Sequence, residues 1–121
     1  MFVLRHRLVL GLAVLCIGAS LAGCTSSKTA AKDVSITSCK AGPNNGHPTA
    51  QGSIHNKSSD ASGYLIHVKF KDSSGNGVGD GAATVAKVEP DATAKWRLTG
   101  TLNVKGPVNC ELGNVKRTAG P

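Results

Sequence analysis

The stretch from residue 64 to residue 71 alternates apolar and polar side chains, and this alternation constrains the fold more than any other feature of the chain. One set of alternate positions holds Tyr64, Ile66, Val68 and Phe70, and the positions between them hold Leu65, His67, Lys69 and Lys71. Successive side chains of a β-strand point to opposite faces, so the stretch is predicted to be a strand with one buried face. Residues 94–98 alternate in the same way, with Trp96 among the apolar positions and Lys95 and Arg97 between them.

Weaker alternation predicts further strands over residues 33–39, 49–56, 79–88, 102–104 and 108–112. Clusters of turn-forming residues separate these stretches, at residues 41–48, 57–63, 72–77 and 89–91. Asn76-Gly77 suits a hairpin turn, because both residues tolerate positive φ angles. Beyond residue 23, no helical spacing of apolar residues extends over more than two turns. The sequence therefore predicts an all-β protein, a small β-sandwich of six or seven strands.

The amino-terminal residues have the three-part layout of a secretory signal. Arg5 and Arg7 make the start positive, residues 8–17 are apolar apart from Gly11, and small residues predominate over residues 18–23. The apolar run is shorter than the roughly 20 residues that a membrane-spanning helix needs. A cleaved signal peptide is therefore predicted at residues 1–23.

Leu21-Ala22-Gly23-Cys24 resembles the lipobox of the bacterial lipoprotein signal family. The resemblance implies that the Cys24 sulfur carries a diacylglycerol, that cleavage precedes it, and that Cys24 begins the mature chain. Two acyl chains give stable anchoring, whereas a single chain binds a membrane only marginally. We therefore expect a lipid-anchored protein on the outer face of the bacterial cytoplasmic membrane or in an outer membrane. A plain secreted protein and an uncleaved single-span anchor are the alternatives.

Cleavage before Cys24 would remove 23 of the 121 residues and leave 98, enough for one small domain. Small and polar residues at 24–32 predict a flexible tether. The β-sandwich domain is expected at residues 33–117 and a tail at 118–121, with fraying from Lys116 onward.

The charge of the mature chain is moderately positive. Twelve Lys and Arg residues oppose seven Asp and Glu residues, which gives +5, and the basic residues are spread along the chain. Nucleic-acid binding is not expected, because it needs a clustered basic patch and usually aromatic stacking platforms. A mild positive charge suits a position beside an anionic membrane or an acidic wall polymer.

Two cysteines remain once Cys16 leaves with the signal and Cys24 takes the lipid. Cys39 and Cys110 are expected to form a disulfide, because the predicted compartment is oxidising. A bridge that closes so long a loop stabilises by on the order of 4 kcal/mol in the chain-entropy account. Free thiols or metal ligands are the alternative, although no Cys-x-x-Cys spacing accompanies the pair.

Three histidines are the candidate metal ligands. His55 and His67 have the same outward parity on two strands expected to form a hairpin, and His47 lies in the loop before the first of these strands. Imidazole groups bind zinc and copper, so these side chains could form a site, and three solvated histidines are the alternative. No metal or cofactor is assigned. The glycine-rich run at residues 75–81 has neither the pattern of a dinucleotide fingerprint nor the acidic ligands of a calcium loop.

A longer pattern extends from Gly52 to Trp96. Its parts are Gly-Ser-Ile-His-Asn-Lys-Ser at residues 52–58, an alternating strand that ends in Asp72 before Gly75, and a turn at Pro90 before an aromatic strand. This pattern resembles the FxLYD family of bacterial extracytoplasmic domains and, more loosely, other immunoglobulin-like lipoprotein domains. The resemblance implies a β-sandwich without established catalytic activity, in which the matched residues are structural.

The functional expectation is a non-catalytic binding or interaction module. The sequence contains no nucleophile elbow and no recognisable acid–base couple, so an enzyme is not expected. Anchored through Cys24, the module would contact an envelope protein or a wall polymer through strand edges or loops. The alternative is a small-ligand or metal carrier that uses the histidine face or a cavity between the sheets. Trp96 is assigned to the core, with a ligand platform as its alternative role.

Overall fold

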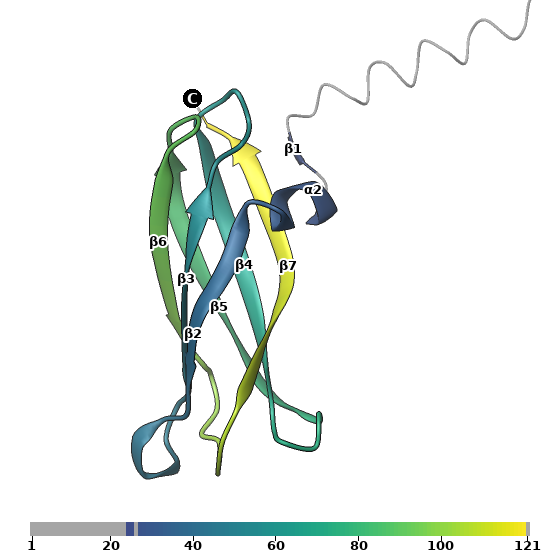
Figure 1. Cartoon of the computed structure of the whole chain (residues 1–121), viewed down its shortest axis with the longest axis vertical. Helices are drawn as coiled ribbons and strands as arrows, with labels where there is room; N and C mark the ends of the chain where they lie inside the picture. Colours follow the sequence, from purple (N-terminus) through teal and green to yellow (C-terminus); the bar gives the residue numbers. More distant parts are fainter. Residues whose placement is uncertain (1–23, 26, 121) are drawn as a thin grey trace, which may run out of the picture.

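The computed structural model describes residues 24–25 and 27–120, and the signal peptide predicted at residues 1–23 lies outside this part of the chain. The elements are β1 (Cys24–Thr25), α2 (Ser27–Ala31), β2 (Val34–Lys40), the 3₁₀ helix η3 (Pro43–Asn45), β3 (Thr49–His55), β4 (Ser62–Lys71), β5 (Gly77–Val88), β6 (Thr93–Thr99) and β7 (Asn109–Ala119). They form two antiparallel sheets, in the orders β1-β7-β4-β5 and β2-β3-β6, that pack face to face (Figure 1). The predicted all-β sandwich is confirmed.

The strand order is that of an immunoglobulin-like sandwich. β3 pairs with β6 in the three-stranded sheet, while β4 pairs with β7 in the four-stranded sheet. Counted from β2, the second strand therefore pairs with the fifth and the third with the sixth, as in immunoglobulin domains. The chain changes sheets after β1, after β3, after β5 and after β6, whereas β2 with β3 and β4 with β5 form hairpins within one sheet.

The core lies between the sheets and is filled by the inward positions that the alternation predicts. The core residues of β4 are each no more than 2% exposed, namely Tyr64, Ile66, Val68 and Phe70. The three-stranded sheet contributes Ala50, Ile54, Trp96 and Leu98. Full burial of a large apolar side chain stabilises by about 1.5–3 kcal/mol. Gly52 on β3 has no room for a side chain, because an added Cβ would overlap the Trp96 ring and the Ser35 carbonyl oxygen.

The side chain of a buried asparagine stabilises the loop that connects β3 with β4. Asn56 Nδ2 donates to the carbonyl oxygens of Asp60, at 2.8 Å, and Val88, at 2.9 Å. Its Oδ1 accepts from the backbone nitrogen of Ser58, at 3.0 Å, and from the Ser58 hydroxyl, at 2.6 Å. These bonds hold a loop that crosses between the sheets. The expected hairpin of residues 49–56 with residues 64–71 is therefore wrong: β3 pairs with β2 and β6, and β4 with β5 and β7.

The last strand is longer than the alternation predicts, because a β-bulge shifts its parity. Val68 lies opposite Leu112, but Ile66 lies opposite Val115, so β7 gains one residue at Gly113-Asn114. Inward positions fall on even numbers before the bulge and on odd numbers after it. Residues 116–119 pair with β4, so the fraying predicted from Lys116 onward is wrong.

The short strand predicted at residues 102–104 is also absent from the structure, which has an irregular connection from β6 to β7 there. Leu102 is 57% exposed, whereas Val104 is 4% exposed. The backbone nitrogen of Val104 donates to the Gly46 carbonyl oxygen at 3.1 Å, so this connection packs against the loop that follows η3.

The amino-terminal segment is packed on the sandwich and differs from the predicted tether at residues 24–32. β1 pairs with the end of β7, with Cys24 opposite Thr118, and α2 follows it beside β7 (Figure 1). Ala30 is completely buried, because the small apolar side chains of α2 fit against the core. Among the described residues, no helix combines the length and the apolar composition needed to span a bilayer.

Candidate functional site

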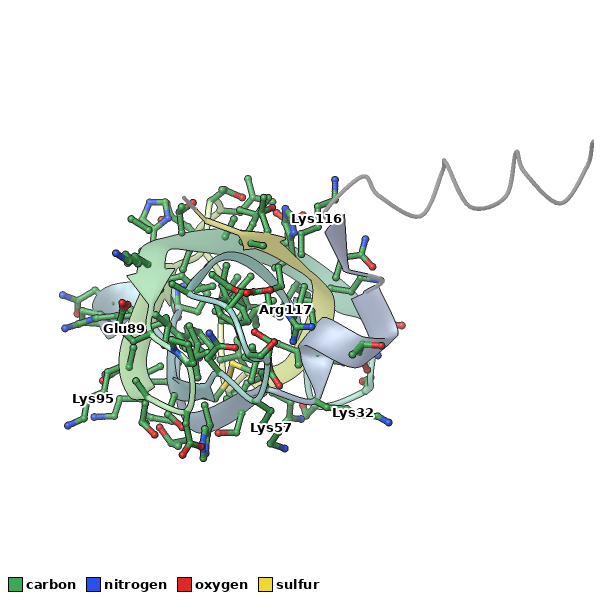
Figure 2. The ribbon with its side chains drawn as sticks, turned by 90° about the horizontal axis from the view of Figure 1, so that it is seen from above. Lys32, Lys57, Glu89, Lys95, Lys116 and Arg117 are labelled. Atoms are coloured by element: carbon green, nitrogen blue, oxygen red, sulfur yellow. A yellow bond between two sulfur atoms is a disulfide. The ribbon has the colours of Figure 1, made fainter. Side chains whose placement is uncertain are left out.

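A buried polar cluster lies at the end of the sandwich that carries α2. Asp33 Oδ2 accepts a hydrogen bond from the Tyr64 hydroxyl at 2.6 Å and another from Arg117 Nη1 at 2.7 Å. The side chains of Asp33 and Arg117 are 2% and 10% exposed. Figure 2 looks down the molecule from this end: Arg117 lies inside the sandwich, whereas Lys32, Lys57, Glu89, Lys95 and Lys116 point outward. The cluster connects the start of β2 with β4 and with the end of β7.

The environment of the cluster keeps the tyrosine protonated. Burial, together with the hydrogen bond to the Asp33 carboxylate and its charge, raises the pKa of Tyr64 to about 12, and the nearby Arg117 guanidinium offsets part of this increase. Tyr64 is therefore a neutral hydrogen-bond donor at physiological pH. Because the three groups satisfy one another inside the protein, the cluster is suited to fixing the structure rather than to reacting with a ligand.

The sequence alone did not single out this cluster. The sequence places Asp33 at the start of a predicted strand, Tyr64 in the apolar core and Arg117 at the end of the predicted domain. The signal that could have identified it is the parity of β7, since Arg117 follows Val115 by two residues on the inward side.

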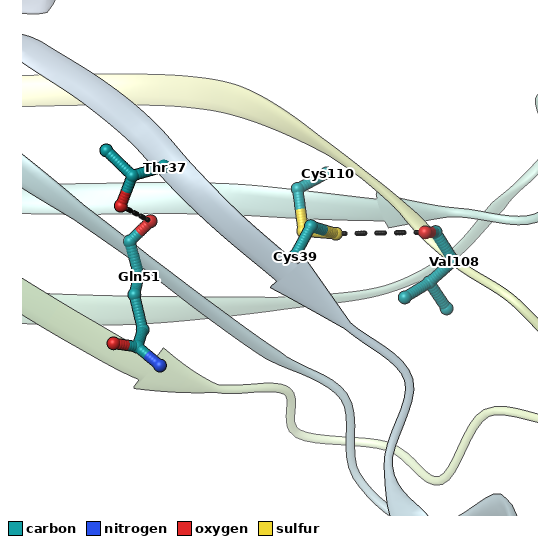
Figure 3. The surroundings of a disulfide bond; sticks show 5 residues. All are labelled: Thr37, Cys39, Gln51, Val108 and Cys110. Carbon is teal, nitrogen blue, oxygen red and sulfur yellow. Dashed lines mark hydrogen bonds between the residues drawn. A yellow bond between two sulfur atoms is a disulfide. The ribbon is translucent and has the colours of Figure 1, made fainter.

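The disulfide between Cys39 and Cys110 is confirmed. It joins β2 with β7, with 5.8 Å between the Cα atoms and 71 residues between the cysteines in the sequence (Figure 3). β2 and β7 belong to different sheets, so the bond links the two layers. The Asp33–Arg117 ion pair links the same two parts of the chain near the other end of β2. The sheets are thus held together along one side by a covalent bond and a buried ion pair.

The three candidate histidines lie apart. His55 Nε2 is 2.8 Å from Asp91 Oδ1, and His47 Nδ1 is 2.8 Å from the Gly100 carbonyl oxygen. His67 is exposed on β4, in the sheet opposite the one that contains His55. The expected histidine face is therefore wrong, because β3 and β4 form no hairpin. Within residues 24–25 and 27–120, no group of three His, Cys, Asp or Glu side chains is arranged to hold a metal.

The outer face of the three-stranded sheet has an unusual distribution of charge. β2, β3 and β6 contain no Asp or Glu, and Lys40, Lys95 and Arg97 on this face are exposed. None of these three cations forms an ion pair within the described chain. The other outward positions, apart from His55 at the end of β3, are short and polar: Ser35, Ser38, Thr49, Gln51, Ser53, Thr93 and Thr99. We call this surface the basic face.

The outer face of the four-stranded sheet differs, because two of its cations, Lys69 and Lys71, lie beside carboxylates. Lys69 on β4 is opposite Asp80 on β5 and Glu111 on β7. Lys71 Nζ is 2.6 Å from Glu111 Oε2, and this hydrogen bond and the positive charge lower the pKa of Glu111. The charges of Lys69 and Lys71 are therefore locally compensated, whereas Lys116 on the same face, like the three cations of the basic face, forms no ion pair among the described residues.

Two hollows open on the four-stranded sheet. One, of about 250 Å³, is lined by residues that include Leu65, Thr84, Val85 and Lys116. The other, of about 240 Å³, is lined by residues that include His67, Lys69, Asp80 and Asn114. Both lie over β4 and its neighbours β5 and β7, so neither is the cavity between the sheets that a small-ligand carrier was expected to use.

Comparison with known proteins adds no relative to this description. No protein-family model matches the chain, and no curated protein and no solved structure matches it. The fold and the surface together define a small, disulfide-bonded β-sandwich with one basic sheet face.

Proposed function

We propose that the chain is a bacterial lipoprotein, anchored through a diacylglycerol on Cys24, whose β-sandwich is a non-catalytic binding module of the cell envelope. The observation that carries the proposal is the sequence Leu21-Ala22-Gly23-Cys24 behind a positive start and a short apolar run. The resemblance of residues 52–96 to FxLYD-type extracytoplasmic domains agrees with it. The Cys39–Cys110 disulfide also supports a position outside the cytoplasm, where such bonds persist.

The position of Cys24 in the fold is compatible with an anchor. Cys24 pairs with Thr118 in the short β1–β7 ladder, at the same end of the sandwich as α2 and the end of β7 (Figure 1). Lys32, Lys57 and Lys116 point outward around this end (Figure 2). Lysines close to an anionic bilayer surface each contribute about 1 kcal/mol of attraction. A lipid on Cys24 would thus bring these three lysines, together with the exposed acids of the same end, toward the headgroups.

The contacts of the described titratable groups favour binding over catalysis. The Asp33 cluster is enclosed and internally satisfied, and the hydrogen bonds of His47 and His55 involve a carbonyl and a carboxylate rather than a hydroxyl or thiol nucleophile. A histidine that activates a nucleophile lies within hydrogen-bond reach of it. The metal-carrier alternative loses the adjacent His55 and His67 on which it depended.

Lipid labelling tests the anchor. Cells that express the full chain are fed a palmitate analogue, and Cys24→Ala is compared with wild type. Cys16→Ala is the matched control, because it removes a cysteine from the apolar run and leaves the lipobox intact. We expect label in wild type and Cys16→Ala and none in Cys24→Ala. Equal labelling of all three proteins would refute the anchor, and cross-linking in intact envelopes that recovers no partner would refute the binding role.

A further inference from the structure

We propose that the basic face binds an acidic polymer of the cell envelope, one whose repeating units carry carboxylate or phosphodiester groups. The proposal extends the function above and rests on it, because such a polymer is available only to a protein outside the cytoplasm. The surface is the outward side of β2, β3 and β6, and its cations are Lys40, Lys95 and Arg97.

The first argument is charge. A surface cation that already faces a carboxylate loses that partner when an anion binds, whereas an unpaired cation loses only water and mobile ions. Lys40, Lys95 and Arg97 have no ion-pair partner among the described residues, and their three strands contain no acid. Their attraction for an anion is therefore uncompensated. It weakens as salt is added, because the Debye length is about 8 Å at physiological ionic strength.

The second argument is geometry. Lys95 and Arg97 are two residues apart on β6, so their Cα atoms are about 7 Å apart on the same face. Lys40 lies on β2, two strands away, at the register of Thr49 and Thr99. Strands are about 4.8 Å apart, so the three cations are spread sparsely across the outer face of the sheet. A linear polymer with repeated anionic groups can meet several of these cations at once.

The third argument is the chemistry of the surrounding side chains. Gln51 lies opposite Arg97 and Ser53 lies opposite Lys95, so each cation has a hydrogen-bonding neighbour. The planar Arg guanidinium matches carboxylate and phosphate oxygens in pairs, while Lys provides a compact charge. The short hydroxyl side chains leave the longer cationic side chains standing above the sheet, where they can reach a hydrated chain.

A protein partner fits this surface less well. Tightly bound protein interfaces are usually centred on aromatic or other large anchors in pockets. The outward positions of the basic face include no aromatic or aliphatic side chain, and Trp96 on β6 points into the core, with its Nε1 donating to the Ser53 carbonyl oxygen at 3.3 Å. The face is therefore suited to a polar, charged ligand.

The anchoring membrane also fits less well. β1 begins at Cys24 and lies at the β7 edge of the four-stranded sheet, whereas Lys95 and Arg97 lie on β6, at the far edge of the other sheet. A lipid on Cys24 would bring the bilayer to the opposite corner of the sandwich. The basic face would then remain open to an extended polymer.

The test measures binding of the full chain, purified in a neutral detergent, to two probes: polygalacturonate for carboxylates and inorganic polyphosphate for phosphates. The variant Lys95→Gln with Arg97→Gln removes two cations from the basic face. Its matched control, Lys69→Gln with Lys116→Gln, removes the same charge from the four-stranded sheet. Both pairs are exposed, and circular dichroism with thermal unfolding verifies that both variants fold.

We expect the basic-face variant to lose on the order of tenfold or more in affinity at low salt, because two of the three cations that would contact the polymer are removed. The control should stay within about twofold of wild type, and neutral dextran should not bind. The probe that binds more tightly identifies the anionic group. Equal losses in the two variants, absence of binding to both probes, or a basic-face variant that loses affinity for acidic vesicles but not for either polymer would overturn the proposal.

The outcomes also separate this inference from the function on which it rests. Polymer binding by a chain that takes no lipid label at Cys24 would refute the anchor and leave the basic face in place. A labelled chain that captures an envelope protein but binds neither polymer would refute the basic face and leave the anchored binding module in place.

Discussion

Replacing Asp33 by Asn is expected to destabilise the domain strongly. The Asp33 carboxylate is the shared acceptor for the Tyr64 hydroxyl and the Arg117 guanidinium, at 2.6 and 2.7 Å. Its removal takes an ion-pair partner at 2.7 Å away from the Arg117 guanidinium, which is 10% exposed. Arg117 lies near the carboxyl end of the chain and Asp33 lies beside α2, so the change loosens the attachment of both ends.

The magnitude follows from the burial of the pair. Removing one partner of a buried ion pair costs about 3–5 kcal/mol, because the remaining charge is desolvated and uncompensated. Small domains unfold with about 5–15 kcal/mol, so the loss is a large part of the total. Each kcal/mol lowers the melting temperature of a domain of this size by about 4–8 °C, which predicts a decrease of about 12 °C or more. Tyr64→Phe should cost less, about 1.5–3 kcal/mol, because it removes one hydrogen bond to a charged acceptor and leaves the ion pair intact.

The assay is urea unfolding of the full chain, followed by circular dichroism. Asp60→Asn is the matched control, since it makes the same chemical change at an exposed carboxylate and should stay within about 0.5 kcal/mol of wild type. The expected order of stability loss is Asp33→Asn, then Tyr64→Phe, then Asp60→Asn. If Asp33→Asn unfolds at the same urea concentration as Asp60→Asn, the ion pair does not hold the ends of the chain.

Three further predictions concern single features of the fold. Replacing Cys39 and Cys110 by Ser should lower the free energy of unfolding in urea by on the order of 4 kcal/mol, because the bond closes a loop with a sequence separation of 71 residues. A decrease below about 1 kcal/mol would contradict the chain-entropy account. Tyr64 is the only tyrosine, so the rise in absorbance at alkaline pH should report its pKa of about 12 directly. Because the pKa is higher in the folded than in the unfolded protein, the stabilising contribution of the neutral tyrosine is present below about pH 10 and is lost as the pH rises toward 12. Titration of the native protein near pH 10 would contradict the buried cluster. Gly52→Ala should destabilise by about 1–3 kcal/mol or more, because its Cβ overlaps the Trp96 ring, and unchanged unfolding with an unchanged tryptophan emission maximum would refute this packing.

The fold class and most strands could be predicted because their signals are local. Alternation around Ile66 and Trp96 identifies the buried face of each strand without knowledge of its partners, and breaker clusters mark the turns. The Cys39–Cys110 bond could be predicted by counting cysteines, because the lipoprotein-like signal accounts for Cys16 and Cys24 and only these two remain.

What could not be predicted depends on pairing between distant strands. The assignment of β3 and β4 to different sheets depends on Asn56, whose buried side chain supports the loop between them, and an isolated Asn carries no such signal in the sequence. The bulge at Gly113-Asn114 reverses the parity of β7, so the alternation stopped at Leu112 and Arg117 was assigned to the end of the domain. The basic face was missed for the same reason: its cations are scattered in the sequence, and only the strand order β2-β3-β6 brings them onto one surface.

The intact mass of the protein isolated from bacterial membranes tests the central proposal most directly. The account predicts a polypeptide that begins at Cys24, carries a diacylglyceryl group on that residue and is two hydrogens lighter than its reduced form because of the Cys39–Cys110 bond. A mature protein that begins at Met1 and carries no acyl group would contradict the anchor and, with it, the position of the domain in the envelope.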